Sequence, residues 1–283
     1  MGKNKKKALR LVDYTVVYGS MLLFVLPALW IVLTSIRPER EVNASPPVWI
    51  PRQITFDAFA KLFGGETMAG SVAFADYFRN TIIIATLSTV IALLVGTLAG
   101  YYFSRHASKY NQWIFLGIML MRSIPGIALS LPLFVVFAKA GLLDKVHGLV
   151  LAYTALNIPF AIWLMQSFFK DIPYELDEAS FVDGCGHWGS FFRIALPLTL
   201  PGLAATGIFI FLISWGEFQI SSVLARTVAS KPFSVGLFDF TTQFTVDWRG
   251  MAAMGVVMLV PAIVFVSLVQ RMLIKGLTAG ASK

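Results

Sequence analysis

The sequence predicts an all-α, polytopic membrane protein with six transmembrane helices. Of its 283 residues, 57% are hydrophobic and only 13% are charged, whereas a soluble domain carries roughly 25% charged residues. The charges are clustered, and the apolar runs between them approach or exceed the ~20 residues that a helix needs to cross the hydrocarbon core. The period-two alternation of membrane barrels is absent, so the backbone hydrogen bonds must close within helices.

Six apolar runs are long enough to be spans, and together they make residues 14–273 a transmembrane domain. Their approximate bounds are 14–36, 80–104, 111–138, 149–169, 194–216 and 250–270. The third run contains Arg122, and the segment Ser123–Pro132, with two prolines and a glycine, is expected to break its helix. The fifth run opens with two prolines, Pro197 and Pro201, which limit where a straight helix can begin.

Small residues mark one face of the second span. Ala92, Gly96 and Gly100 follow one another at intervals of four residues. Such spacing lets another helix approach closely. We therefore expect this span to have a tightly packed partner helix.

The basic residues predict the topology. Six spans place both termini on one side, and the tail of residues 1–13 carries five Lys and Arg residues beside the first span. Because basic residues favour the cytoplasmic side, both this tail and the C-terminal tail 274–283 are expected there. The loops 37–79 and 217–249 then lie outside. The positive-inside bias accounts for most of the net charge of +8. The basic residues are not gathered on one soluble face, so the sequence does not indicate a nucleic-acid partner.

One acidic loop, residues 171–190, carries the motifs that need interpretation. Gly184, Gly186 and Gly189 match G-x-G-x-x-G, but a dinucleotide site needs a preceding strand and an acid about 20 residues later. Here the preceding segment is a predicted helix, and the next acid is Glu217. The glycine pattern is therefore interpreted as accidental.

The acids of this loop also do not indicate a metal or an active site. The three histidines, His106, His147 and His187, lie in separate loops, and the predicted topology places His147 on the opposite side. A formed pocket with a histidine, lysine or metal partner is not indicated. We expect no catalytic residue and no metal ligand in this chain.

An amphipathic helix is the interpretation that the residues favour. Asp171, Glu175 and Glu178 share one face at spacings of four and three, and an apolar face adjoins it. Pro173 suits a first helical turn, Asp171 is an expected cap, and Gly184 can end the helix with a positive φ. Such a loop, with no soluble domain of its own to cover, predicts a protein partner.

The spacing of this loop resembles a family signature. Glu178, Ala179 and Ser180 are followed after three residues by Gly184 and after nine more by the segment Ile194–Pro197. This resembles the E-A-A, x3, G, x9, I-x-L-P signature of membrane subunits of binding-protein-dependent ABC importers, with Ser180 in place of the second alanine. SWGEF at Ser214–Phe218, the DWRGMAA stretch and the terminal GLTAGASK are similar to the carbohydrate branch, which includes the maltose transporter.

The resemblance implies that the acidic loop is a coupling helix seated in a cytoplasmic ATPase subunit, where Glu178 would meet a basic residue. The positions that it assigns to this contact are Glu175, Glu178, Ala179, Ser180, Asp183, Gly184, Ile194, Leu196 and Pro197. A second ATPase contact is implied for Gly276, Leu277, Thr278, Ala279 and Gly280 in the C-terminal tail.

The resemblance also implies the partners and the location. It predicts a multi-pass protein of the inner membrane that works with a second, homologous permease subunit, two ATPase subunits and an extracytoplasmic solute-binding protein that touches loop 217–249. The chain itself is then not an enzyme and binds no cofactor, while ATP and magnesium belong to the ATPase subunits. Solute would cross by alternating access.

Five polar or helix-breaking residues within the spans are candidates for the translocation pathway: Arg122, Pro125, Asn157, Trp215 and Glu217. Structural pairing or packing is an open alternative for each of them. Two other functions also remain open. One is import of amino acids, polyamines or peptides, and the other is ion-coupled secondary transport with Arg122 and Glu217 as buried charges.

Overall fold

The computed structural model describes residues 3–67, 70–243 and 245–280, and the chain divides into two compact units. Unit 1 comprises Met1–Val72 with Leu237–Val260, and unit 2 comprises Ala73–Gly236 with Pro261–Lys283. Apart from one two-stranded hairpin, the regular elements of the described residues are helical. The all-α prediction is confirmed.

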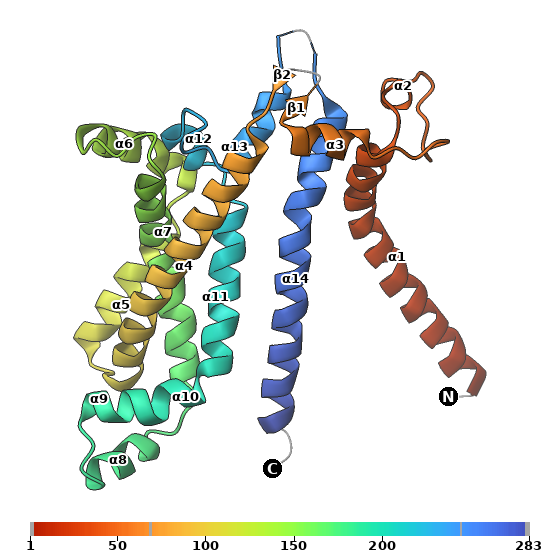
Figure 1. The fold of residues 1–283 in the computed structure, drawn as a ribbon. Coiled ribbons are helices and arrows are strands. Elements are labelled where there is room, and N and C mark those ends of the chain that lie inside the picture. Colours follow the sequence, from red (N-terminus) through yellow and green to blue (C-terminus); the bar gives the residue numbers. More distant parts are fainter. Residues whose placement is uncertain (1–2, 68–69, 244, 281–283) are drawn as a thin grey trace. The chain divides into compact units, whose positions relative to one another are not determined.

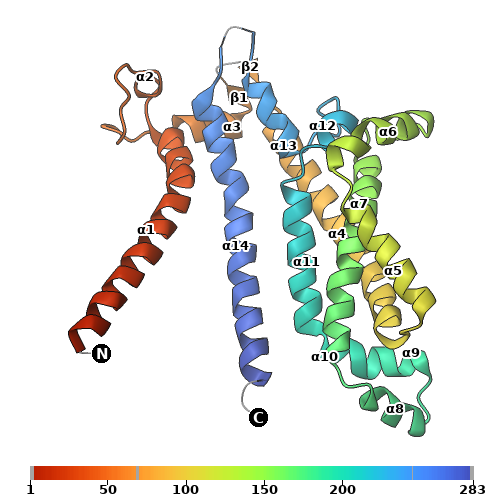
Figure 2. The ribbon, with the colours of Figure 1, turned by 180° about the vertical axis from the view of Figure 1, so that it is seen from behind.

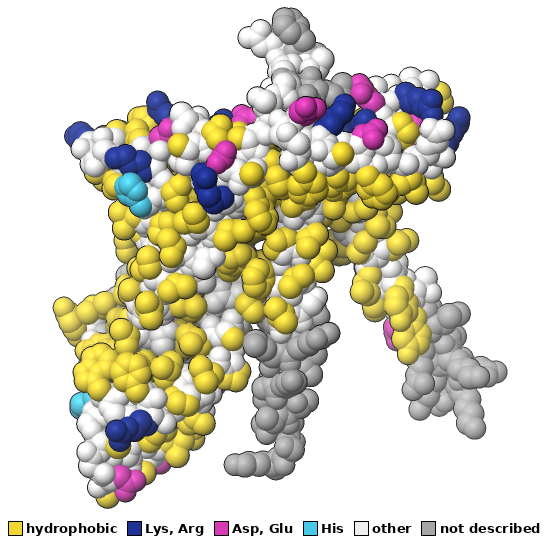
Figure 3. Space-filling model, in the orientation of Figure 1, with side chains coloured by type: hydrophobic (Ala, Val, Ile, Leu, Met, Phe, Trp, Pro, Cys, Tyr) yellow, Lys and Arg dark blue, Asp and Glu magenta, His cyan; other side chains and the backbone are white. Residues whose placement is uncertain are grey.

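Four helices are long and apolar enough to cross a membrane: α1 (Lys3–Ile36), α4 (Phe74–Arg105), α7 (Val146–Lys170) and α14 (Trp248–Gly280). Two bent helix pairs raise the number to six if each pair counts as one span. In unit 2, hydrophobic side chains cover the flanks of the helices, and charged side chains gather at the two ends (Figure 3).

The first bent pair contains the break that was expected in the run 111–138. Helices α5 (Lys109–Arg122) and α6 (Gly126–Lys139) meet at 93°. Pro125 occupies the N-cap position of α6 with a ψ of 132°, and the residue before a proline is disfavoured in the helical region. The chain therefore turns at 123–125, whereas Pro132 lies inside α6.

The second bent pair lies at the expected start of the fifth span. One helical segment runs through α9 (His187–Ser190), the π-helical turn η1 (Phe191–Ala195) and α10 (Leu196–Leu198), and it meets α11 (Leu200–Trp215) at 74°. Pro201 lies in the first turn of α11, where its missing N–H is tolerated. The straight helix α11 thus begins at Leu200, after the bend.

The core of unit 2 is the pair α4 and α7, which lie side by side with α11 against both (Figure 1). The small residues of α4 face α7, because a Cβ added at Gly96 would lie 2.3 Å from the Ala161 Cβ and one at Gly100 would lie 2.8 Å from the Met165 Cβ. Ala92 belongs to the same buried contact, with Ala161 and Ile210. The expected tight partner of the second span is therefore α7.

Unit 1 contains a buried arginine, Arg37, that holds the turn after α1. It contains α1, the short helices α2 (Glu39–Val42) and α3 (Asp57–Gly64), the antiparallel hairpin β1 (Glu66–Thr67) and β2 (Gly70–Ser71), the 3-10 turn η2 (Leu237–Phe240) and the first part of α14. Arg37 is buried and donates to the Leu33 and Val48 carbonyls. Its guanidinium lies 4.7 Å from the Trp30 ring centroid, which fixes the turn after α1.

The remaining short helices all lie in unit 2. They are α8 (Glu175–Val182), α12 (Ser221–Leu224) and α13 (Phe233–Gly236). Helices α8 and α9 lie at the end of the unit where α4 and α7 also end (Figure 2). The acidic loop is therefore placed at one end of the α4 and α7 pair.

Candidate functional site

The acidic loop forms the short helix α8, which lacks a side-chain cap at its N-terminal end. Asp171 is the C-terminal cap residue of α7, and the N-cap position of α8 is Tyr174, which makes no side-chain capping bond. The expected role of Asp171 as the cap of this helix is therefore wrong, because α8 begins only after Pro173. Three acids in the first turn of α8 still suit the positive end of its dipole.

Gly184 ends α8 as predicted. Its φ is +85°, the Gly184 N–H donates to the Phe181 carbonyl and the Cys185 N–H donates to the Ser180 carbonyl. This pair of bonds is the Schellman arrangement, which needs a left-handed residue. A side chain at this position would therefore strain the end of the helix.

The outer face of this end presents acids beside apolar side chains. Glu175, Glu178 and Asp183 are exposed, as are the predicted contact residues Ala179, Gly184 and Pro197. Ile194 and Leu196 are half-buried, and Ser180 is buried with its hydroxyl donating to the Asp177 carbonyl. The side chain of Val182 is 88% exposed. This face of α8 therefore presents both negative charge and one apolar side chain.

A buried carboxylate that sequence reasoning missed lies beneath this surface. Asp177 is 1% exposed and pairs with Arg105 of α4, with 2.6 Å between the Arg105 Nε and the Asp177 Oδ2. The Tyr101 hydroxyl donates to the Asp177 Oδ1 over 3.1 Å, and the Ser190 hydroxyl donates to the same oxygen. Nothing in the sequence distinguishes Asp177 from its acidic neighbours. Arg105 could be identified from the sequence only as a basic residue of a short loop.

Arg105 also holds the end of α7. Its Nη1 donates to the carbonyls of Phe169 and Ile172, over 3.0 and 3.2 Å. One guanidinium thus joins the C-terminal ends of α4 and α7 to α8, and Ser190 adds α9. Because four elements share one buried network, α8 is fixed to the two long helices and must move with them.

Two of the predicted histidines also lie near this network. His106 and His187 line a cavity of about 370 Å³ together with Arg105 and several aromatic residues. Within the described residues, no group of three or more His, Cys, Asp or Glu side chains could hold a metal ion. His147 does not line this cavity, so the cavity does not bring the three histidines together.

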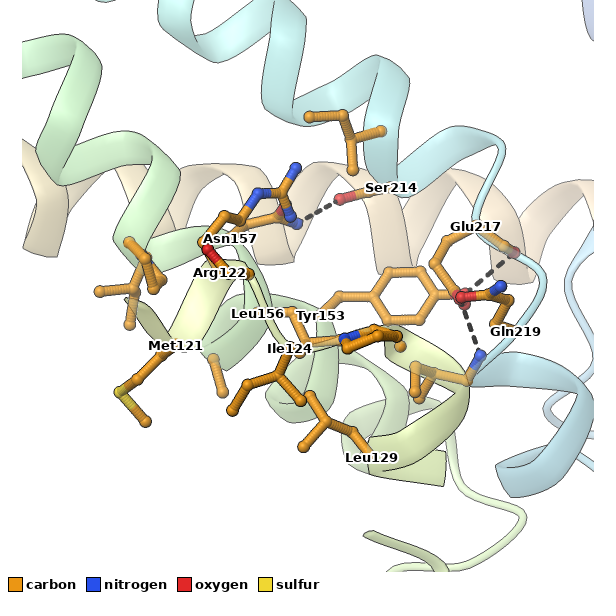
Figure 4. Close-up of a pocket in the computed structure, with 18 of the residues that line it drawn as sticks. Met121, Arg122, Ile124, Leu129, Tyr153, Leu156, Asn157, Ser214, Glu217 and Gln219 are labelled. Atoms are coloured by element: carbon orange, nitrogen blue, oxygen red, sulfur yellow. Dashed lines mark hydrogen bonds between the residues drawn. The ribbon is translucent and has the colours of Figure 1, made fainter. Parts of the chain in front are cut away.

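A second cavity, of about 740 Å³, opens in unit 2 between α5, α7, α11 and residues 217–220 (Figure 4). Four of the predicted pathway residues line it: Arg122, Pro125, Asn157 and Glu217. Trp215 does not line it. It is 4% exposed and packs against the Phe78, Phe211 and Phe233 rings. Trp215 is therefore a packing residue within this unit.

Arg122 is the cationic residue of this cavity. It ends the 14-residue helix α5, which at ~1.5 Å per residue places it about 20 Å along that helix, well inside a ~30 Å apolar layer. Its guanidinium lies 5.3 Å from the Phe160 ring centroid and has no ion pair with any described residue. A cation–π contact contributes about 0.5–2 kcal/mol, whereas a charge at such depth costs about 2.5–3.5 kcal/mol. The contact with Phe160 therefore does not fully compensate for a charge at such depth.

Asn157 and Glu217 differ in how fully they are bonded. The Asn157 Nδ2 donates to the Ser214 Oγ over 2.9 Å, but its buried Oδ1 has no hydrogen-bond partner among the described residues. The Glu217 carboxylate accepts the N–H groups of Ile220 and Ser221, over 2.7 and 3.1 Å. Glu217 thus caps α12, while Asn157 keeps an open acceptor at the cavity.

Asp144, in the turn between α6 and α7, anchors a distant loop. Its carboxylate accepts the backbone N–H groups of Arg226 and Thr227 and the hydroxyls of Thr227 and Ser230, all within 2.9 Å. Partial burial raises the pKa of the Asp144 carboxyl, but these donors outweigh it and hold the pKa below its usual range. The anchor is therefore present throughout the neutral range.

Loss of this anchor is expected to free the loop at residues 225–231. Because the folded-state pKa is lowered, the stabilisation is complete above the usual carboxyl pKa of ~4 and is lost only as the pH falls below it. In Asp144→Ala, the amides of Arg226 and Thr227 should exchange hydrogen faster at neutral pH, measured by mass spectrometry. The exposed-acid variant Asp76→Ala is the control, and equal exchange in both variants would contradict the anchor.

Comparison with known proteins shows the family to which this chain belongs. Residues 92–279 match the family model described as "Binding-protein-dependent transport system inner membrane component". The chain is 34% identical over 260 residues to a probable ABC transporter permease, y4oR, of Sinorhizobium fredii, covering 92% of this chain and 91% of that protein. It is 33% identical over 271 residues to the trehalose transport system permease SugB of Mycobacterium tuberculosis, covering 95% of each.

A solved structure has the same fold. It is that of a bacterial ABC transporter involved in the import of the acidic polysaccharide alginate, with a TM-score of 0.78 over 96% of this chain and 98% of that chain. The sequence identity is 20%, so the likeness concerns the fold alone. Both bent helix pairs and the short helices between them thus lie within a region of shared architecture.

Proposed function

Because this chain belongs to the family of binding-protein-dependent transport system inner membrane components, and is thus a multi-pass permease of the inner membrane, we propose that it imports a carbohydrate. It is one permease subunit of an ATP-driven importer for a sugar, polyol or related solute. The similarity to a trehalose permease over 95% of the chain supports this solute class over amino acids, polyamines or peptides.

The exposed face of α8 is the ATPase contact. The observation that carries the proposal is the placement of Glu175, Glu178 and Asp183 on an exposed face, next to the apolar Val182, on a helix held by buried contacts. Acids at such a face suit a basic cleft, and Val182 suits an apolar contact. Two ATPase subunits, which bind ATP and magnesium, are the cytoplasmic partners, and a second homologous permease completes the membrane part.

Movement of α8 drives the transport cycle. When the ATPase dimer closes, α8 is displaced, and the Asp177 and Arg105 pair transmits the displacement to the ends of α4 and α7. Since α7 and α11 line the cavity, their rotation as rigid bodies changes the side of the membrane to which it opens. Alternating access then follows from a lever motion rather than from chemistry in this chain.

Two further contacts complete the assembly. Loop 217–249, one segment of which is anchored by Asp144, receives the extracytoplasmic solute-binding protein. The backbone of α14 is helical through Gly276–Gly280, and this end forms a second ATPase contact. Residues 281–283 of the expected tail lie outside the described residues.

The structure also bears on the ion-coupled alternative. A secondary carrier would need an acid free to bind the coupling ion. Both Glu217 carboxylate oxygens are occupied by the N–H groups of Ile220 and Ser221. This bonding gives Glu217 a structural role at the start of α12, and that role supports the ATP-driven mechanism over one in which Glu217 binds a coupling ion.

Two substitutions in the coupling segment test the proposal. In Glu178→Ala the acid at the ATPase contact is removed, and in Gly184→Val a β-branched residue is forced to a positive φ, which costs about 1–3 kcal/mol. Uptake of labelled trehalose or other sugars in proteoliposomes should fall at least tenfold in both, while the protein level in the membrane persists. Glu39→Ala, an exposed acid of α2, should transport normally.

The outcome separates the two mechanisms. ATP-dependent uptake that survives an ionophore supports the importer. Uptake that continues without ATP and stops when the ion gradient is collapsed would exclude it. Normal uptake by both Glu178→Ala and Gly184→Val would remove the ATPase contact from α8.

A further inference from the structure

We infer that the cavity of unit 2 contains a subsite for an acidic group of the solute, so that the transported carbohydrate carries a carboxylate or a sulfur oxyanion. The Arg122 guanidinium binds the acidic group, and the Asn157 Oδ1 accepts a hydroxyl of the same molecule. The inference rests on the proposed import function and names the class of solute that the site takes.

The charge balance of the cavity is the first argument. Arg122 and Glu217 are the only Lys, Arg, Asp or Glu side chains among the described residues that line it. The Glu217 carboxylate accepts the backbone N–H groups of Ile220 and Ser221, and it lies at the other end of the labelled side chains from Arg122 (Figure 4). Arg122 has no ion pair among the described residues. The Arg122 end of the cavity therefore presents a positive charge with no ion-pair partner among the described residues.

The geometry of the guanidinium is the second argument. A guanidinium that lies against an aromatic ring, as Arg122 does with Phe160 at 5.3 Å, keeps its N–H groups available at its edge. These donors match the paired oxygens of a carboxylate or sulfonate in a bidentate way. Arg122 is also exposed in the isolated chain, so a solute can reach it, and it stays charged at any physiological pH.

Asn157 supplies the polar contact beside the charge. It is 3% exposed, its Nδ2 is committed to Ser214, and its Oδ1 is an open acceptor in a buried position. Arg122 and Asn157 lie together at one end of the labelled side chains, with Glu217 and Gln219 at the other end (Figure 4). An unsatisfied buried acceptor is costly, so a sugar hydroxyl that donates to it is favoured.

The rest of the cavity suits a sugar ring. The other lining side chains are mostly apolar, as with Ile118, Leu156 and Ile213, and they can cover the C–H faces of a pyranose. The volume of about 740 Å³ lies within the range of ~300–1,000 Å³ that small-molecule pockets have. A single acidic monosaccharide unit therefore fits next to Arg122 with room for a second unit.

The experiment uses the purified complex of both permeases and both ATPase subunits, without the binding protein, which would add its own specificity. Thermal unfolding is followed with sodium glucuronate, sodium glucose 6-sulfate or glucose at equal concentration, with sodium chloride balancing the ionic strength. At least one acidic sugar should raise the Tm of the wild-type complex, and glucose should not. The two acidic sugars distinguish a carboxylate from a sulfur oxyanion.

Variants then assign the effect to Arg122. Arg122→Gln should weaken the apparent affinity for the acidic sugar about 10- to 100-fold, as expected for loss of a charge-assisted hydrogen bond. Arg122→Lys keeps the positive charge but loses the paired N–H donors of the guanidinium. Its apparent affinity for the acidic sugar should lie between those of the wild type and Arg122→Gln. If Arg122→Gln fails to assemble, Arg122→Lys is tested in its place. Arg79→Gln, which removes an exposed arginine outside the cavity, should respond as the wild type does.

Three results of the unfolding experiment would overturn the inference. They are an equal response to glucose, no response to either acidic sugar, and an unchanged response when Arg122 is substituted. The second result is expected if Arg122 instead pairs with an acid of the other permease. ATP-dependent uptake of a neutral sugar alone would overturn this inference and leave the proposed import function intact.

Discussion

Asp177→Ala is expected to abolish transport and to destabilise the protein, although Asp177 lies beneath the proposed ATPase contact and not on it. The substitution leaves the Arg105 guanidinium, whose side chain is 7% exposed, without its counter-charge. Breaking a buried ion pair by removing one partner costs about 3–5 kcal/mol. The Tyr101 and Ser190 hydroxyls lose their acceptor as well. The measurement is the Tm of the assembled transporter together with its solute-stimulated ATPase rate.

The neighbouring acid Glu175 provides the matched control. It lies on the same helix but is exposed, so Glu175→Ala should change the free energy of unfolding by no more than about 0.5 kcal/mol. If Asp177→Ala and Glu175→Ala are equally stable, the buried network does not fix α8.

A double variant separates stability from transmission. Replacing a buried ion pair by apolar residues is often neutral or stabilising, so Asp177→Leu combined with Arg105→Met should recover much of the lost Tm. The Phe169 and Ile172 carbonyls still lose their donor in this variant. We expect the ATPase to remain poorly stimulated by solute, because α8 is no longer tied to the end of α7. Full recovery of stimulation would show that packing alone transmits the motion.

Gly96→Ala is expected to destabilise the protein even though it improves the helix propensity of α4. In an exposed helix this change would gain up to about 1 kcal/mol. Here the new Cβ would lie 2.3 Å from the Ala161 Cβ and 2.9 Å from the Ala161 carbonyl carbon. The backbone of α7 must therefore move, and overpacking of this kind costs about 1–3 kcal/mol. The Tm of the purified transporter should fall.

Gly117 and Ala161 provide the control and the rescue. A Cβ at Gly117 of α5 meets nothing within 4 Å, so Gly117→Ala should leave the Tm unchanged or raise it. Ala161→Gly removes the methyl group that the new Cβ strikes, so the pair Gly96→Ala and Ala161→Gly should regain part of the loss. A higher Tm for Gly96→Ala alone would contradict the close approach of α4 and α7.

The spans and the signature of this protein could be read from its sequence because both depend on local pattern. The apolar runs and the clustered charges predict helices of membrane length, and the four-residue spacing of Ala92, Gly96 and Gly100 predicts a tight helix contact. Gly184 is recognisable because only glycine readily adopts its backbone conformation. None of these inferences needs to know which residue lies opposite.

The errors arose where a local pattern permits two outcomes. Asp171 can cap the helix that follows or end the helix that precedes, and the structure shows the second. Pro197 and Pro201 both permit a helix start, but the straight helix α11 begins at Leu200, beside the second proline. A proline restricts where a helix begins, and tertiary packing decides between the permitted places.

The sequence by itself determined that this is an all-α membrane protein with an acidic segment at a fixed distance from Pro197. Only the tertiary structure decided that Asp177, rather than its exposed neighbours, is buried against Arg105, and that Arg122 and Asn157 share a cavity. The physical reason is that burial and charge pairing depend on residues far apart in the chain. Acids in similar local sequence differ in burial and in charge pairing because the fold places different residues next to them.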